Sequence, residues 1–159
     1  WWRPISSSTW DRCRDFSNAL DSKKRSYGSS RYWHGDSHFV GTVAESLVGV
    51  LAGIPVNLDI HTEGDGGSDF SCVDVKSSTF LSDPHLKVSP WELKGNDFVL
   101  VVVDLTGRRA RVAGWANDEM VRSGSRHDYG HGYRYVLTEQ ELHRGLPPNL
   151  TSHLPPVSS

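Results

Sequence analysis

The fold is decided by the stretch FVLVVVDLTGRRARVAGWA, residues 98–116. Its first part, 98–105, is a continuous apolar run rich in valine, which is typical of a strand buried on both faces. A polar turn at Gly107 follows, and the chain then returns as a second strand. We therefore expect a β-hairpin around Gly107 in the middle of a sheet.

Two helices are expected before this hairpin, because residues 8–25 and 38–53 carry apolar side chains at helical spacing. Shorter strands are expected at 56–62, 71–78, 85–90 and 133–137. Short helical segments are expected after Asn117, as a capping residue, and after Thr138, which can form a capping box with Glu141. The order predicts one α/β (α+β mixed) domain over residues 1–146, with a central mixed sheet flanked by helices. The Pro- and Ser-rich segment 147–159 is expected to be irregular.

Composition excludes some classes of protein. Of the 159 residues, 36% are hydrophobic and 23% charged, and no apolar run approaches the roughly 20 residues of a membrane span. Cys13 and Cys72 are far apart and lack CxxC spacing, which argues against a disulfide framework or a zinc knuckle. We expect a cytoplasmic protein without a membrane partner. The net charge of -2 does not exclude nucleic acid, because acidic metal ligands can offset a basic surface.

An acidic cluster precedes and enters one of the predicted strands, in GDGGSDFSCVDVKSS (64–78). Strand alternation places Asp74 and Lys76 on one face and anchors Val73 and Val75 in the core on the other. A tight bend can bring Asp69 opposite Asp74, and Asp65 lies in the turn. Carboxylates this close repel unless a cation holds them, and hard oxygen ligands favour Mg²⁺ or Mn²⁺. The cluster therefore predicts half of a divalent-metal site.

Glu45 is a candidate for a further acid at this site. It lies on the second predicted helix, on a stripe of small residues that includes Gly41 and Gly49. Such a stripe permits close docking of the helix. A single acid at the boundary of an apolar helix needs solvent or a cation, and the predicted metal edge could supply the cation.

Together, Glu45 in a helix, GDGGSDF and VDVKSS resemble the active-site pattern of the PD-(D/E)XK, restriction-endonuclease-like nuclease superfamily. The resemblance covers residues 40 to 80, and the later strands with their GWA segment look like small phage-encoded members. Ser68 stands where the motif has its proline. The resemblance implies a restriction-endonuclease-like core and a magnesium-dependent endonuclease-type hydrolase that cuts DNA.

The resemblance also implies roles for individual residues. Asp69 and Asp74 would bind the metal together with the backbone carbonyl of Val75, and Asp65 is the rival first acid. Glu45 would complete the site directly or through a metal-bound water. Lys76 would orient or help to deprotonate the attacking water, while the metal stabilises charge and lowers the pKa of that water.

Nucleic-acid contacts are expected from basic residues that are interleaved with aromatic ones along 108–134, a mixture that suits phosphate binding. The candidates are Arg108, Arg109, Arg111 and Arg126. The histidines around 34–38 and 127–131 lie in glycine-containing loops that pre-organise zinc poorly, so substrate contact is the better interpretation.

The preferred hypothesis is a metal-dependent nuclease from a phage or mobile element that acts on DNA or alternatively RNA. The sequence also allows the protein to form an oligomer. A catalytically inactive nucleic-acid-binding module of the same fold is one alternative. A toxin nuclease domain that acts on DNA or tRNA is another. The intact set of Glu45, Asp69, Asp74 and Lys76 favours the enzyme.

Overall fold

The computed structural model describes residues 1–26, 37–54, 70, 72–130 and 132–151. The described elements are, in order, β1 (Arg3–Pro4), α1 (Ser7–Ser26), α2 (Ser37–Ala52), β2 (Val73–Ser78), β3 (His85–Val88), the 3-10 helix η1 (Pro90–Glu92), β4 (Asp97–Asp104), β5 (Arg109–Ala116), α3 (Asp118–Arg122), β6 (Ser125–Asp128), β7 (Tyr133–Thr138), η2 (Glu139–Glu141) and α4 (Pro148–Thr151). The mixed α and β class is confirmed. The predicted strand at 56–62 lies outside the described residues.

The first sheet has the strand order β1-β5-β4-β2. Strands β4 and β5 form the predicted antiparallel hairpin, with a register shift between Leu100 and Val101. Strand β2 runs parallel to β4, and Val75 lies opposite Val99. Both parallel and antiparallel pairs are therefore present, as expected for a mixed sheet.

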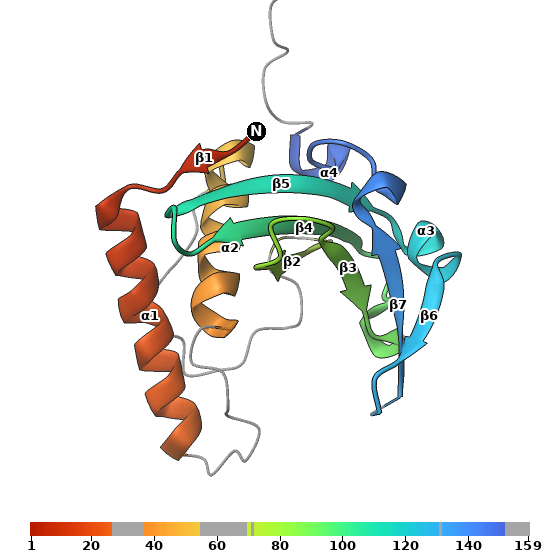
Figure 1. Cartoon of the computed structure of the whole chain (residues 1–159), viewed down its shortest axis with the longest axis horizontal. Helices are drawn as coiled ribbons and strands as arrows, with labels where there is room; N and C mark the ends of the chain where they lie inside the picture. The colour runs from red at the N-terminus through yellow and green to blue at the C-terminus, as the bar shows by residue number, and fades with distance from the viewer. Residues whose placement is uncertain (27–36, 55–69, 71, 131, 152–159) are drawn as a thin grey trace, which may run out of the picture.

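A second sheet, ordered β3-β7-β6, corrects the expectation of one central sheet. Figure 1 shows it descending from one end of the first sheet. The physical reason lies in β4, which is buried on both faces. Val99, Val101 and Val103 pack toward the helices, whereas Phe98 and Leu100 belong to a second apolar cluster with residues of β3 and β7. Each face of β4 therefore needs its own covering layer.

Helices α1 and α2 pack against each other on the Val99 face of the first sheet (Figure 1). The Trp10 ring meets the Phe39 ring edge-on at a centroid distance of 4.8 Å. The boundaries of both helices agree with the predicted ranges to within one residue. Within the described residues, no helix is long and apolar enough to cross a membrane.

The predicted caps near the C-terminal end are confirmed. Asn117 accepts a hydrogen bond from the Met120 amide at 2.8 Å, and Thr138 and Glu141 form a capping box. The expectation that the chain is irregular from residue 147 is wrong for Pro148–Thr151, which form α4. Leu150 is only 2% exposed and packs in the helix-side core, Pro147 is also buried, and Asn149 donates a hydrogen bond to Asp97, so these contacts hold the segment.

The β4–β5 turn is held by the Asp104 carboxylate. It accepts hydrogen bonds from the Gly107 amide at 3.0 Å and from the Arg109 guanidinium at 2.9 Å. A Cβ atom at Gly107 would lie 2.5 Å from an Asp104 oxygen, so glycine leaves room for the carboxylate. The hydrogen bond from Arg109, followed by that from Gly107, lowers the pKa of Asp104 below its ordinary value.

We predict that Asp104→Asn lowers the free energy of unfolding at neutral pH, because Arg109 loses its charged partner. A carboxyl pKa that is lower in the folded state adds stability above its unfolded value of about 4, and this stability is lost as the pH falls through the folded value. Urea unfolding at pH 7 and near pH 2 should therefore show a difference between wild type and variant that shrinks in acid. A difference independent of pH would contradict this assignment.

Candidate active site

Strand β2 carries the candidate chemistry on one face and core residues on the other. Val73 is fully buried beneath the helices, and Val75 packs against the same cluster. Asp74 and Lys76 alternate to the opposite face, where their register partners on β4 are Phe98 and Leu100. The acid and the base therefore project from the same face, as the alternation predicted.

Asp74 is a nearly buried carboxylate, with 8% of its surface exposed. One of its oxygens accepts a hydrogen bond of 3.2 Å from the side-chain amide of Asn96, which is also buried. Asn96 immediately precedes β4, so the parallel pairing of β2 with β4 brings the two side chains together. A buried carboxylate needs such donors, because an unpaired buried charge is strongly unfavourable.

Lys76 forms an ion pair and hydrogen bond with Glu92, a residue that the sequence analysis missed. Glu92 lies on η1, and its other carboxylate oxygen accepts a hydrogen bond of 2.7 Å from the Ser89 amide. Both side chains of the pair are about one quarter exposed, at 27% and 26%. The capping pattern S-x-x-E at 89–92 was the available sequence signal, but it predicts a helix start and not a partner for Lys76.

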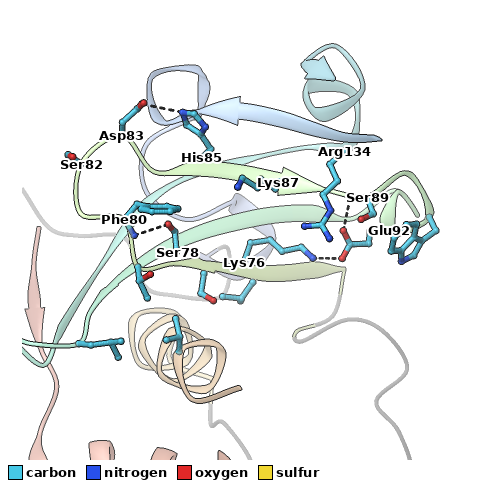
Figure 2. Close-up of a pocket in the computed structure, with 16 residues that line it drawn as sticks. Lys76, Ser78, Phe80, Ser82, Asp83, His85, Lys87, Ser89, Glu92 and Arg134 are labelled. Carbon is cyan, nitrogen blue, oxygen red and sulfur yellow. Dashed lines mark hydrogen bonds and ion pairs between the residues drawn. The ribbon is translucent and has the colours of Figure 1, made fainter. Parts of the chain in front are cut away.

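Lys76 lines a cleft of about 950 Å³ beside β2 and β3. Figure 2 shows Lys76 on one side, Lys87 and Arg134 on the other, and Phe80 and Glu92 at opposite ends. Hydroxyl groups also line the cleft, from Ser77, Ser78, Thr79, Ser82 and Ser89. Ammonium, guanidinium and hydroxyl groups that share one cleft are suitable donors to phosphate oxygens.

Glu45 lies on α2, which packs on the Val73 face of the sheet, whereas Lys76 projects from the other face. Burial raises the pKa of the Cys13 thiol, and the negative charge of Glu45 adds a smaller rise. Val40, also on α2, lines the cleft. The role of Glu45 as a third acid stays a prediction.

The first-motif acids, Asp65 and Asp69, lie outside the described residues. Within the ranges that the structure describes, no group of three His, Cys, Asp or Glu side chains is placed to hold a metal ion. The described part of the proposed ligand set is therefore the Asp74 carboxylate and the Val75 carbonyl on β2, together with Glu45 on α2.

The predicted nucleic-acid arginines fall in two places. Arg109 and Arg111 lie on β5, paired with Asp104 and Glu139 respectively. Both guanidinium groups also stack on the Trp2 ring, Arg109 at 4.3 Å and Arg111 at 5.4 Å from its centroid. These interactions hold the two arginines in place, and strand β4 lies between their strand, β5, and β2.

The other two arginines are more exposed. Arg108 occupies the β4–β5 turn with a positive φ of 50°, and its guanidinium lies 5.6 Å from the Trp10 ring. Arg126 lies on β6 over the Tyr133 and Tyr135 rings, at 5.2 Å and 5.4 Å. Sequence reasoning missed Lys87, and it included Arg134 only as one residue of the basic 108–134 segment, because only the pairing of β3 with β7 places both beside Lys76.

Of the histidines considered in the sequence, His38 lies in the first turn of α2, and His127 lies on β6 with its ring centroid 6.3 Å from that of Tyr129. His34 and His131 lie outside the described residues. No protein-family model, no curated protein and no solved structure matches this chain.

We predict that Asn96→Ala lowers the free energy of unfolding by ~1–3 kcal/mol, because the buried Asp74 carboxylate loses a donor. A double-mutant cycle with Asp74→Ala isolates the pair, and urea unfolding should give a coupling energy of ~0.5–3 kcal/mol. Asn149→Ala is the control, because Asn149 donates instead to Asp97. A coupling energy of zero between residues 74 and 96 would show that their contact does not stabilise the fold.

Proposed function

We propose that this protein is a metal-dependent nuclease that hydrolyses phosphodiester bonds in DNA, with the PD-(D/E)XK type of active site. The observation that carries the proposal is the placement of Asp74 and Lys76 on one face of β2, with Lys76 lining a cleft that also contains Lys87 and Arg134. A carboxylate for a metal and cations for a phosphate are thereby combined in one region.

The residues of β2 suit a magnesium ion by their chemistry. The Asp74 carboxylate and the Val75 carbonyl are hard oxygen donors, which Mg²⁺ and Mn²⁺ prefer to nitrogen or sulfur. The proposed site also draws on Asp69 or Asp65 from the preceding segment. Glu45 lies on the helix that covers the other face of the sheet, so as the further acid it would have to reach the ion around the edge strand β2. A bound ion would lower the pKa of a coordinated water and offset negative charge at the scissile phosphate.

The protein's own groups would orient the substrate. The Lys76 ammonium lines the cleft and is paired with Glu92. From there it would donate a hydrogen bond to a phosphate oxygen or to the attacking water. The Ser89 amide fixes the Glu92 carboxylate, so Glu92 acts in this proposal as a positioning residue for Lys76. Arg134 and Lys87 would hold the phosphates on either side of the reacting one.

The ion pair between Lys76 and Glu92 favours a second candidate, the catalytically inactive nucleic-acid-binding module. In that case the lysine has a structural partner and needs no reacting phosphate. Activity separates the two candidates, because only the enzyme requires a divalent metal and the Lys76 ammonium for turnover.

We predict that Lys76→Ala reduces cleavage by about a hundredfold or more, the usual effect of losing a group that stabilises charge in the transition state. Plasmid, linear duplex, branched DNA, single-stranded DNA and RNA would each be incubated with Mg²⁺, Mn²⁺ or EDTA. Asp74→Ala should abolish cleavage, and circular dichroism would confirm that each variant is folded. Lys94→Ala is the matched control, because Lys94 is exposed and does not line the cleft.

Retention of the wild-type rate by Lys76→Ala in Mg²⁺ would overturn the catalytic assignment. Nucleic-acid binding without metal-dependent cleavage of any of these substrates would favour the inactive module instead.

A further inference from the structure

Two large aromatic side chains at the cleft are left exposed. Phe80, in the connection between β2 and β3, is 66% exposed, and Trp91, on η1, is 73% exposed. Neither belongs to the two apolar clusters that form the core. Phe80 lies at one end of the cleft, and Trp91 is next to Glu92, which lies at the other end (Figure 2). The lining therefore offers two aromatic surfaces to a ligand.

The cations between these aromatic residues remain available. Within the described residues, Lys76 is paired with Glu92, and the His85 ring lies 3.3 Å from an Asp83 oxygen, whereas neither Lys87 nor Arg134 forms an ion pair. Lys87 lies 5.0 Å from the centroid of the Tyr129 ring, which is 49% exposed and extends the aromatic lining beyond the cleft. The positive charges of Lys87 and Arg134 outnumber the single negative charge of Asp83, so the cleft has a net positive charge that is complementary to a polyanion.

We propose that this cleft binds a single-stranded segment of nucleic acid, with bases stacked on Phe80 and Trp91 and phosphates held by Lys87 and Arg134. The inference rests on the proposed nuclease function, and it narrows the substrate from nucleic acid in general to single-stranded segments. In a duplex the base faces are already stacked on one another, so exposed aromatic rings gain little from it. A single strand can turn its bases onto such rings, while its phosphates follow the cationic side chains between them.

The same arrangement argues against a protein partner as the occupant. An apolar protein surface would cover the aromatic rings, but it would also bury the unpaired Lys87 and Arg134, which is unfavourable without matching carboxylates. Nucleic acid satisfies both features at once, because each nucleotide supplies an aromatic face and a negative charge.

Fluorescence anisotropy on the full chain tests the proposal, with a labelled 12-nucleotide oligothymidine and a duplex of equal length, both in EDTA so that nothing is cut. We expect the single strand to bind more tightly than the duplex. Trp91→Ala and Phe80→Ala should each weaken single-strand binding by roughly fivefold to a hundredfold, the usual loss for one stacked base. Lys87→Ala and Arg134→Ala should each reduce the salt slope by about 0.7, the value for one phosphate contact on a single strand.

Matched controls lie on the other side of the first sheet. Trp1 is fully exposed and Arg144 is exposed, and both line a separate groove beside β5, so their alanine variants should bind like wild type. Equal affinity for duplex and single strand, or unchanged binding by Trp91→Ala and Phe80→Ala, would overturn the inference. In that case the proposal of metal-dependent cleavage would be unaffected. Conversely, single-strand binding lost in Trp91→Ala without any cleavage would support this surface and reject the nuclease.

Discussion

The structure depends on the burial of β4 from both sides. Its valines pack under α1 and α2, while Phe98 and Leu100 pack against the second sheet. A strand buried in this way can exchange backbone hydrogen bonds only with neighbours in the sheet, and these are β5 and β2. The parallel partner β2 is thereby held in a fixed register, with Asp74 beside Phe98 and Lys76 beside Leu100.

This register explains why a charged strand lies next to the core. Val73 anchors β2 beneath the helices, so Asp74 must point to the other face, where Asn96 compensates its burial. Lys76, two residues on, reaches the cleft and meets Glu92. The same backbone constraint thus produces both the nearly buried carboxylate and the half-buried cation on which the proposed chemistry rests.

Local patterns allowed much of the fold to be predicted. The valine run, the turn at Gly107 and the capping residue Asn117 each act within a few neighbouring residues, and the hairpin and caps were correct. The second sheet was missed because β3 pairs with β7, some fifty residues later in the chain, as in the pair His85 and Thr138. Tertiary contacts of Pro147, Asn149 and Leu150 likewise hold a segment whose composition indicated irregular structure.

In the candidate site, too, local patterns predicted some features, and tertiary contacts decided the others. Alternation along β2 sufficed to place Asp74 and Lys76 together, whereas Glu92 and Arg134 arrive from η1 and β7 through tertiary contacts that no local pattern encodes. Composition indicated a basic and aromatic surface, but it could not show that Arg109 and Arg111 are held by Asp104 and Glu139. Pairing within the fold therefore decides which cations remain for a ligand.

The central claim is that β2 presents Asp74 to a divalent cation. Electron paramagnetic resonance of Mn²⁺ titrated into the protein measures this directly, with Asp74→Asn as a variant of nearly the same shape. We expect a saturable Mn²⁺ site in the wild type that is lost or greatly weakened in Asp74→Asn, with the variant still folded. Equal Mn²⁺ binding by the two proteins, or no saturable site in the wild type, would contradict it.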